Sequence, residues 1–273
     1  MTRNINILNP IQKLYKYKFF GFQPKIEIFY ETKDFIVKTC SSLNELEKSF
    51  SLRYKVFYKE KIGKIKLTGI DSDKYDKIAD HIVIIDKNKN KIVGSYRVLS
   101  SVYTDNFYSE SEFDISDLKS RNYIMLELGR AVIDKEYRNG IVLALLWKGI
   151  SLYTKQTNAD YLFGLSSYFT ENPEKAAKMY LYLEKNGIIN KEFNIIPKRK
   201  YEYPSFENLL LNVEYDEDIK NEIPSLLISY IKAGAFVSGY PAYDFKFRCF
   251  DFFTLLDVNN IDKRFERKFK KWS

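Results

Sequence analysis

The chain has 273 residues, 45% of them hydrophobic and 16% aromatic, which is enough for a large core and excludes disorder as a description of the whole. Lysine and arginine total 44 against 36 aspartates and glutamates, and this excess predicts an acidic partner: nucleic acid, an anionic bilayer surface or an acidic protein. Two distant cysteines, Cys40 and Cys249, and a single histidine, His81, disfavour a disulfide framework, a thiolate zinc site and Ser-His-Asp catalysis.

Residues 1–30 are predicted to form a basic, amphipathic segment. Asn9 and Pro10 are typical of a helix start, and apolar residues follow them at helical spacing. This pattern suits a bilayer surface, although a helix packed on the domain is an equal alternative. No apolar run reaches the ~18 residues of a membrane span, and no signal peptide is visible. We expect a cytoplasmic protein, and leave open a peripheral position on the inner face of the cytoplasmic membrane.

Residues 31–273 are predicted to form one mixed α/β domain with a basic C-terminal tail. Ser42 and Glu45 form a capping box that opens a helix running to about residue 60. Prolines and glycines mark the ends of further helices, which are expected over 141–157, 173–187 and 226–237. Apolar runs predict strands over 35–39, 81–86, 91–99, 124–133, 161–166 and 247–256.

The strand over 124–133 carries two charged residues in an otherwise apolar run. Glu127 and Arg130 are costly to bury unless they are paired or functional. Their spacing places them on opposite faces of an ideal strand, and a β-bulge that Gly129 permits would realign them. One interpretation is a buried ion pair that ties the sheet together. The other is a cleft in which Glu127 accepts a proton and Arg130 orients a substrate.

Two short motifs are weaker. The turn Arg138-Asn139-Gly140 precedes a helix and could present backbone N–H groups to a phosphate, but it lacks the spacing of a Walker or Rossmann loop. The spacing of His81 and Asp86 matches the histidine–aspartate motif of glycerolipid O-acyltransferases. Five residues along a strand separate two side chains by ~16 Å on opposite faces, so we interpret this match as coincidental.

Several segments in order resemble one known family. They are Arg53-Tyr-Lys-Val-Phe57, Asp73-Lys-Tyr-Asp76, Val93-Gly-Ser-Tyr-Arg97, Glu127-Leu-Gly-Arg130, Tyr137-Arg-Asn-Gly140 and Gly239-Tyr-Pro-Ala-Tyr-Asp244. Together they are similar to the ornithine lipid synthases, which are L-ornithine Nα-acyltransferases that use acyl carrier protein thioesters. In outline the same segments resemble acyl-homoserine lactone synthases. Both resemblances imply an α/β (α+β), GNAT-like acyltransferase fold with a central mixed twisted sheet flanked by helices.

The resemblance implies direct attack of an amine on a thioester, without a covalent enzyme intermediate. Glu127 is the predicted base, and Tyr180 is predicted to protonate the leaving thiolate. Substrate binding is expected from Arg53, Phe57, Asp73, Asp76, Arg97 and Arg130. Donor binding is expected from Arg138, Asn139, Gly140, Ser166 and Ser167. No resident cofactor or metal is expected, and the donor would be the phosphopantetheine thioester of acyl carrier protein.

The function predicted on this basis is transfer of a long, 3-hydroxylated acyl chain to the α-amine of L-ornithine. The expected partners are acyl carrier protein, an amino acid acceptor and a peripheral membrane surface, with no nucleic acid. Acylation of glycine or another amino acid, or acyl-homoserine lactone-type synthesis, remains an alternative. A membrane- or nucleic-acid-binding protein without catalysis is the alternative from another class.

Overall fold

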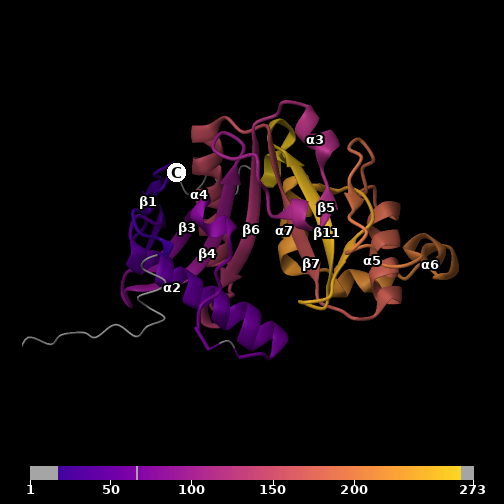
Figure 1. The fold of residues 1–273 in the computed structure, drawn as a ribbon, viewed down its shortest axis with the longest axis horizontal. Helices are drawn as coiled ribbons and strands as arrows, with labels where there is room; N and C mark the ends of the chain where they lie inside the picture. The colour runs from indigo at the N-terminus through magenta and orange to yellow at the C-terminus, as the bar shows by residue number, and fades with distance from the viewer. Residues whose placement is uncertain (1–17, 66, 266–273) are drawn as a thin grey trace, which may run out of the picture. The chain divides into compact units, whose positions relative to one another are not determined.

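The computed structural model describes residues 18–65 and 67–265, and these divide into two compact units. The first unit contains the described residues up to Arg97 together with Arg130–Tyr153, and the second contains Val98–Gly129 and the described residues from Thr154 onward. By these ranges β4 (Lys91–Ser100) and β6 (Met125–Ile133) each contribute residues to both units, and Figure 1 labels the two strands.

The first unit contains the sheet order β1-β2-β3-β4-β6. Its outer strands are β1 (Phe29–Glu31), β2 (Phe35–Thr39) and β3 (Asp80–Asp86). β2 is antiparallel to both β1 and β3. The predicted strands over 35–39, 81–86 and 91–99 are therefore confirmed within a residue or two.

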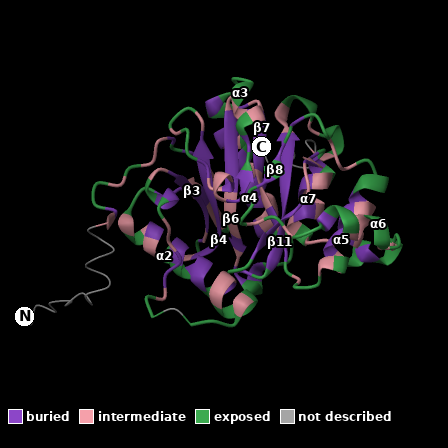
Figure 2. Cartoon of the chain, turned by 45° about the vertical axis from the view of Figure 1, so that its right-hand side comes forward, coloured by how far each residue is buried: buried purple, intermediate pink, exposed green. Residues whose placement is uncertain are grey.

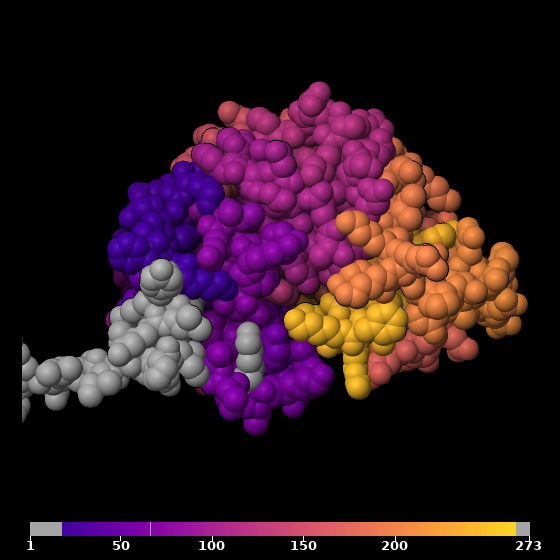
Figure 3. Space-filling model, viewed as in Figure 1, coloured from indigo at the N-terminus to yellow at the C-terminus, as the bar shows by residue number. Residues whose placement is uncertain are grey.

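Two helices of the first unit pack on this sheet or beside it. Helix α2 (Leu43–Tyr54) begins at Ser42, whose Oγ accepts a hydrogen bond from the backbone N–H of Glu45. The α-helix does not run to residue 60 as predicted, because at Lys55–Ile62 it changes to a π-helix, which Gly63 ends at a φ of 67°. This π-helix lies at the surface of the first unit, in purple in Figure 3.

Helix α4 (Ile141–Thr157) matches its predicted bounds and lies close to the sheet. A Cβ at Gly149 would come within 2.7 Å of Ile82 and 2.9 Å of Val37, so only glycine allows this helix to approach β2 and β3 so closely.

The second unit contains the order β4-β6-β7-β11-β10, with β9 also paired to β11. Strand β7 (Tyr161–Tyr168) is parallel to β6 and antiparallel to β11 (Cys249–Asp257). The shorter strands are β10 (Ala242–Asp244) and β9 (Phe236–Val237), and a separate pair is formed by β5 (Phe113–Asp114) and β8 (Ile196–Pro197). Parallel and antiparallel pairs therefore coexist, and the predicted mixed sheet with flanking helices is confirmed.

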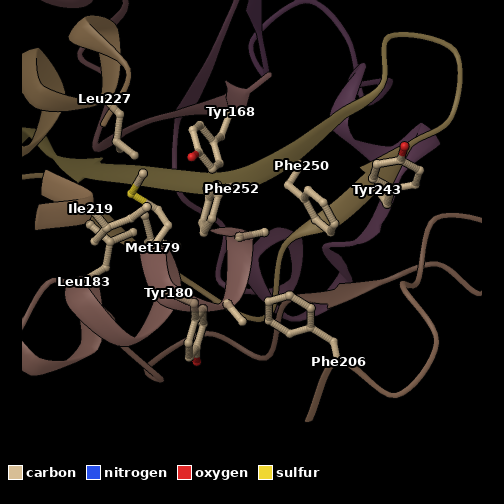
Figure 4. Packing of buried hydrophobic residues seen from close by; sticks show 13 residues of the cluster. Tyr168, Met179, Tyr180, Leu183, Phe206, Ile219, Leu227, Tyr243, Phe250 and Phe252 are labelled. Atoms are coloured by element: carbon tan, nitrogen blue, oxygen red, sulfur yellow. The ribbon is translucent and has the colours of Figure 1, made fainter. Parts of the chain in front are cut away.

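Three helices of the second unit bury their apolar faces in one core, and they are α5 (Pro173–Lys185), α6 (Phe206–Asn212) and α7 (Ser225–Ala233). The short helix α3 (Ser116–Ser120) buries Leu118 outside this core. The side chains of Met179 from α5 and Phe252 from β11 meet in this core (Figure 4). Figure 2 shows the strands largely buried and the outer surface of α6 exposed.

The helix predicted over 226–237 is wrong at its C-terminal end. It stops at Ala233 because Gly234 adopts a left-handed φ of 100°, and the next residues join β9. The predicted N-terminal helix lies almost wholly outside the described residues, as does the end of the basic tail, and the boundary at residue 30 stays a prediction. Within the described part of the chain, no helix has the length and apolarity to cross a membrane.

Candidate active site

A buried ion network of three arginines and three aspartates lies in the first unit. Arg53, on α2, donates from Nε to Asp71 Oδ2 at 3.1 Å. Its Nη1 and Nη2 donate to the two carboxylate oxygens of Asp76 at 2.7 and 3.2 Å. The side chains of Arg53 and Asp76 are fully buried. This bidentate geometry uses the planar guanidinium fork that lysine lacks.

Arg97 and Arg130 connect Asp73 to the same network. Arg97 Nη1 lies 2.8 Å from both oxygens of Asp73 and 3.3 Å from Asp76 Oδ1. Arg130 Nη2 donates to Asp73 Oδ2 at 3.1 Å, and its Nε lies 3.6 Å from Asp71 Oδ2. The structure therefore brings together five residues predicted to bind substrate and adds Asp71 as a sixth. With equal numbers of each sign, the network is formally neutral.

The network has one sealed end and one end that reaches solvent. Asp73 keeps 24% of its side chain exposed and Arg130 keeps 12%, whereas Arg97 keeps 2%. The Phe57 ring centre lies 5.8 Å from the Arg130 guanidinium carbon, so this predicted residue also lies at the more open end. A polar molecule from solvent can therefore reach Asp73 and Arg130 more readily than Arg53 or Asp76.

Opposite charges outweigh burial in setting the ionisation of this network. Burial alone would raise the pKa of Asp76, but the charges of Arg53 and Arg97 lower it far below its ordinary value. Burial would likewise raise the pKa of Asp73, and Arg97 and Arg130 lower it. Both carboxylates are therefore ionised at neutral pH, and both are already matched by arginines.

His81 lies against the network without adding charge to it. Its ring is fully buried, with Nε2 3.3 Å from the backbone oxygen of Asp76, and Nδ1 has no hydrogen-bond partner among the described residues. Burial lowers the pKa of His81 to about 4, so the ring is neutral at physiological pH. Asp86 lies apart from it and accepts a hydrogen bond from the Tyr137 hydroxyl at 2.7 Å, as expected if the histidine–aspartate match is coincidental.

The backbone of β6 is distorted at Arg130. This residue has a φ of 53°, which is the left-handed region and is uncommon for any residue other than glycine. A left-handed residue within a strand is the conformation of one type of β-bulge. The sequence predicted that Gly129 would permit such a bulge, and the positive φ falls on the next residue. Such backbone strain costs about 1–3 kcal/mol and is found mostly where function requires it.

In the second unit, Glu127 is buried and held by a loop. Its carboxylate accepts hydrogen bonds from the backbone N–H groups of Tyr108 and Ser109, both at 2.6 Å, and from the Ser109 hydroxyl at 2.5 Å. Only 3% of the residue is exposed. The charge that looked costly in an apolar strand is thus met by two backbone N–H groups and a hydroxyl. This arrangement fixes the direction of the carboxylate.

The remaining predicted residues of the second unit lie on β7 and α5. Ser166 accepts a hydrogen bond from Thr254, and Ser167 donates one to Asp251 at 2.5 Å. Tyr180 packs against Phe206 in the hydrophobic core (Figure 4). Burial raises the pKa of Tyr180, so its hydroxyl keeps its proton at neutral pH. These three roles stay predictions.

The turn before α4 lies in the first unit. Arg138 Nη2 donates to Glu60 at 2.5 Å, and its Nε donates to the backbone oxygen of Ile133. Asn139 Oδ1 accepts from the backbone N–H of Ile141 at 3.2 Å and so caps the start of α4. Gly140 has a φ of 92° and nothing within 4 Å of where a Cβ would be, so the turn is open at this point.

Sequence reasoning missed the residues that complete these two arrangements. Asp71 joins the ion network, and Tyr108 and Ser109 hold Glu127. Asp71 stands two residues before Asp73, so an acidic loop was a usable signal. The donors from Tyr108 and Ser109 are backbone groups, which every loop possesses, and no sequence signal singles them out.

We expect Asp76→Asn to lower the free energy of unfolding by about 3–5 kcal/mol, because it leaves Arg53 and Arg97 buried without a full counter-charge. Asp73→Asn is the matched control and should cost clearly less, since Asp73 is partly exposed. Urea denaturation of both variants measures the difference. Equal losses would contradict a network with one sealed and one open end.

Stability should depend on pH through His81. Because its folded pKa of about 4 lies below the unfolded value near 6.5, the unfolded chain binds the extra proton as the pH falls below 6.5. Between pH 8 and pH 5 the free energy of unfolding of the wild type should fall by about 2 kcal/mol more than that of His81→Gln. The variant is a suitable reference because it has the same carboxylates as the wild type and lacks only the histidine. Chemical denaturation at several pH values checks this. Parallel curves for the two proteins would rule it out.

Comparison with known proteins adds to this geometry. Residues 52–148 match the family model described as acetyltransferase (GNAT) domain. The L-ornithine N(alpha)-acyltransferase of Agrobacterium fabrum (strain C58 / ATCC 33970) is 29% identical over 237 residues, which cover 81% of this chain and 80% of that protein. The protein of the same name from Brucella abortus (strain 2308) is 28% identical over 246 residues, which cover 84% and 86%.

Solved structures with a similar arrangement are more distant in sequence. The AHL synthase LasI is 13% identical with a TM-score of 0.46, over 82% of this chain and 90% of that one. FeeM, an N-acyl amino acid synthase from uncultured soil microbes, is 10% identical with a TM-score of 0.48, over 84% and 93%. The predicted GNAT-like fold is confirmed by the family match and the mixed sheet. The chain is therefore an acyltransferase with a GNAT domain, and its sequence relatives include L-ornithine Nα-acyltransferases.

Proposed function

We propose that this protein transfers a long, 3-hydroxylated acyl chain from acyl carrier protein to the α-amine of L-ornithine. The main support is the match over four-fifths of the chain to L-ornithine Nα-acyltransferases of three other bacteria at 28–29% identity. The donor would be the phosphopantetheine thioester of acyl carrier protein, which is an acidic protein and suits a chain with a formal charge of +8.

The reaction requires removal of a proton from the α-ammonium group before its nitrogen can attack. In the proposed mechanism the Glu127 carboxylate takes this proton, directly or through one water. The nitrogen then forms a bond to the thioester carbon, the carbon–sulfur bond breaks, and the thiolate takes a proton from the Tyr180 hydroxyl. The acylated nitrogen gives its second proton to the resulting Tyr180 phenolate, directly or through water, which leaves a neutral amide, a free thiol and a protonated Glu127. Three hydrogen bonds aim the Glu127 carboxylate, which supports a role that depends on its direction.

The acceptor amino acid carries both charge signs, and the open end of the ion network offers both. Arg130 is proposed to contact the acceptor carboxylate and Asp73 its side-chain ammonium, because these two side chains are the most exposed of the network. Arg53, Asp76 and Arg97 would hold them in position. The left-handed backbone at Arg130 supports a functional placement of this guanidinium.

The donor is proposed to lie near two sets of residues. Backbone N–H groups at Asn139 and Gly140, with Arg138, would receive the single phosphate of phosphopantetheine at the start of α4. Ser166 and Ser167 would lie along the pantetheine arm. The product carries a long acyl chain, which would make a peripheral position on the cytoplasmic membrane useful, and the basic N-terminal segment would serve there.

Purified protein with 3-hydroxyacyl-acyl carrier protein and ornithine should form Nα-acyl ornithine, detected by mass spectrometry. Glycine in place of ornithine tests the alternative acceptor, and its preferential acylation would overturn the choice of ornithine. Absence of any N-acyl product with a panel of amino acids would favour a binding protein without catalysis.

Glu127→Gln should reduce kcat at least ~100-fold, because an amide cannot accept the ammonium proton. Glu110→Gln, in the same loop as the Glu127 partners, is the matched control and should keep its activity. Circular dichroism must show both variants folded. Full activity of folded Glu127→Gln would remove Glu127 as the base while leaving the acyltransferase assignment intact.

Asp73→Asn should lower kcat/KM for ornithine about 10- to 100-fold, which corresponds to the loss of one charge-assisted hydrogen bond. With 2-aminopentanoic acid, which is ornithine without its side-chain amine, the same variant should match the wild type. Steady-state kinetics with both acceptors separates the two effects. An equal loss for both acceptors would mean that Asp73 does not contact the side-chain ammonium.

A further inference from the structure

Three carboxylates that the proposed mechanism does not use gather in the second unit. Glu112 follows the 3-10 turn Ser109–Ser111, Asp244 ends β10, and Asp251 lies on β11. One oxygen from each lies within 4.8 Å of the others. All three residues are buried, with 1%, 5% and 4% exposed. The sheet therefore concentrates three acidic groups in a space largely closed to water.

No basic side chain balances this cluster within the described part of the chain, where none of the three carboxylates forms an ion pair. Asp251 accepts from the Ser167 hydroxyl and lies 3.6 Å from the Cys249 sulfur, while Asp244 Oδ1 accepts from the backbone N–H groups of Lys246 and Phe247. Glu112 Oε2 is fully buried and accepts no hydrogen bond from a described residue. A buried carboxylate oxygen without a donor is costly unless a proton or a cation meets it.

We propose that Glu112, Asp244 and Asp251 bind one hard divalent cation of the Ca²⁺, Mg²⁺ or Mn²⁺ class. Carboxylate oxygens are the ligands such ions prefer, at about 2.0–2.6 Å, and oxygens so close together fit around one ion. The unpartnered Glu112 oxygen is a ready ligand. The cation would supply the positive charge that the surrounding residues do not.

The electrostatics of the cluster agree with this placement. Burial and the nearby Asp251 and Asp244 charges raise the pKa of Glu112 to about 10, and burial raises that of Asp251 to about 6. The cluster thus strongly disfavours its own full negative charge. Two neutralising agents are possible, a bound cation or bound protons, and they make different predictions.

The cation would also fix the loop that holds Glu127. Glu112 ends the 3-10 turn, with its backbone N–H donating to Ser109, and Ser109 donates to Glu127 from both its N–H and its hydroxyl. Binding Glu112 to strands β10 and β11 would therefore restrain the donors of Glu127. The cation would thus help to position Glu127. The proposal that the cation binds does not rest on the proposed function.

Metal analysis and thermal unfolding of the purified full chain test the proposal. The protein is dialysed against Mg²⁺, Ca²⁺ or Mn²⁺ and then passed through a desalting column. It should retain about one equivalent of one of these ions, measured by inductively coupled plasma mass spectrometry. At saturation that ion should raise the unfolding midpoint by ~5 °C over protein treated with a chelator. No retained ion and no shift with all three would mean that protons neutralise the cluster, and would overturn the proposal.

Variants locate the ion. Glu112→Gln should abolish both retention and the thermal shift, whereas Asp114→Asn, an exposed acidic residue two positions away, should leave both intact. The chelator experiment on wild-type protein keeps the test valid if Glu112→Gln fails to fold. Retention of the ion by folded Glu112→Gln would assign it to another site and overturn the proposal. Failure of the acyl transfer assay has no bearing on these readouts.

Discussion

The central constraint in this protein is the cost of taking charged side chains out of water. Arg53 and Asp76 are fully buried in the first unit, and each alone would be strongly destabilising there. They are tolerated because three guanidinium groups and three carboxylates meet with bidentate geometry and no net charge. The same pairing limits substrate binding, because an arginine and an aspartate that are already paired with each other are less able to bind a charged substrate. Only the partly exposed end, at Asp73 and Arg130, retains both structural partners and access to solvent.

Glu127 meets the same constraint in another way. Its carboxylate accepts hydrogen bonds from two backbone N–H groups and one hydroxyl. Backbone dipoles stabilise and orient a carboxylate without placing a full positive charge beside it. For a proposed base these hydrogen bonds matter, because they fix the direction from which the carboxylate can accept a proton. A loop is also easier to displace than a buried ion network, so the direction of Glu127 depends on what anchors residues 107–112.

Local patterns predicted the elements, and long-range contacts decided the site. The capping residue Ser42, the helix over 141–157 and the charged strand at Glu127 follow from residue types and spacing. The end of α7 at Gly234 was missed because an apolar run continues past a glycine that turns the chain. The resemblance grouped Asp73, Asp76, Arg97 and Arg130, but only the structure shows that they neutralise one another. Ion pairs of this kind join residues that are far apart in sequence, so the spacing of residues along the chain cannot predict them.

The two acidic groupings of this chain differ in one decisive respect. Asp71, Asp73 and Asp76 face three arginines, and the pKa values of Asp73 and Asp76 are lowered as a result. Glu112, Asp244 and Asp251 face hydroxyls, a thiol and backbone groups, and the pKa values of Glu112 and Asp251 are raised. Residues of both groupings are buried, so burial alone does not explain why the pKa values are lowered in one and raised in the other. The difference is that arginine side chains contact the first grouping, whereas no basic side chain of the described residues pairs with the second. A chain with 44 basic residues places none of its described ones on this second grouping, which is the physical reason to look for a positive charge from outside the polypeptide.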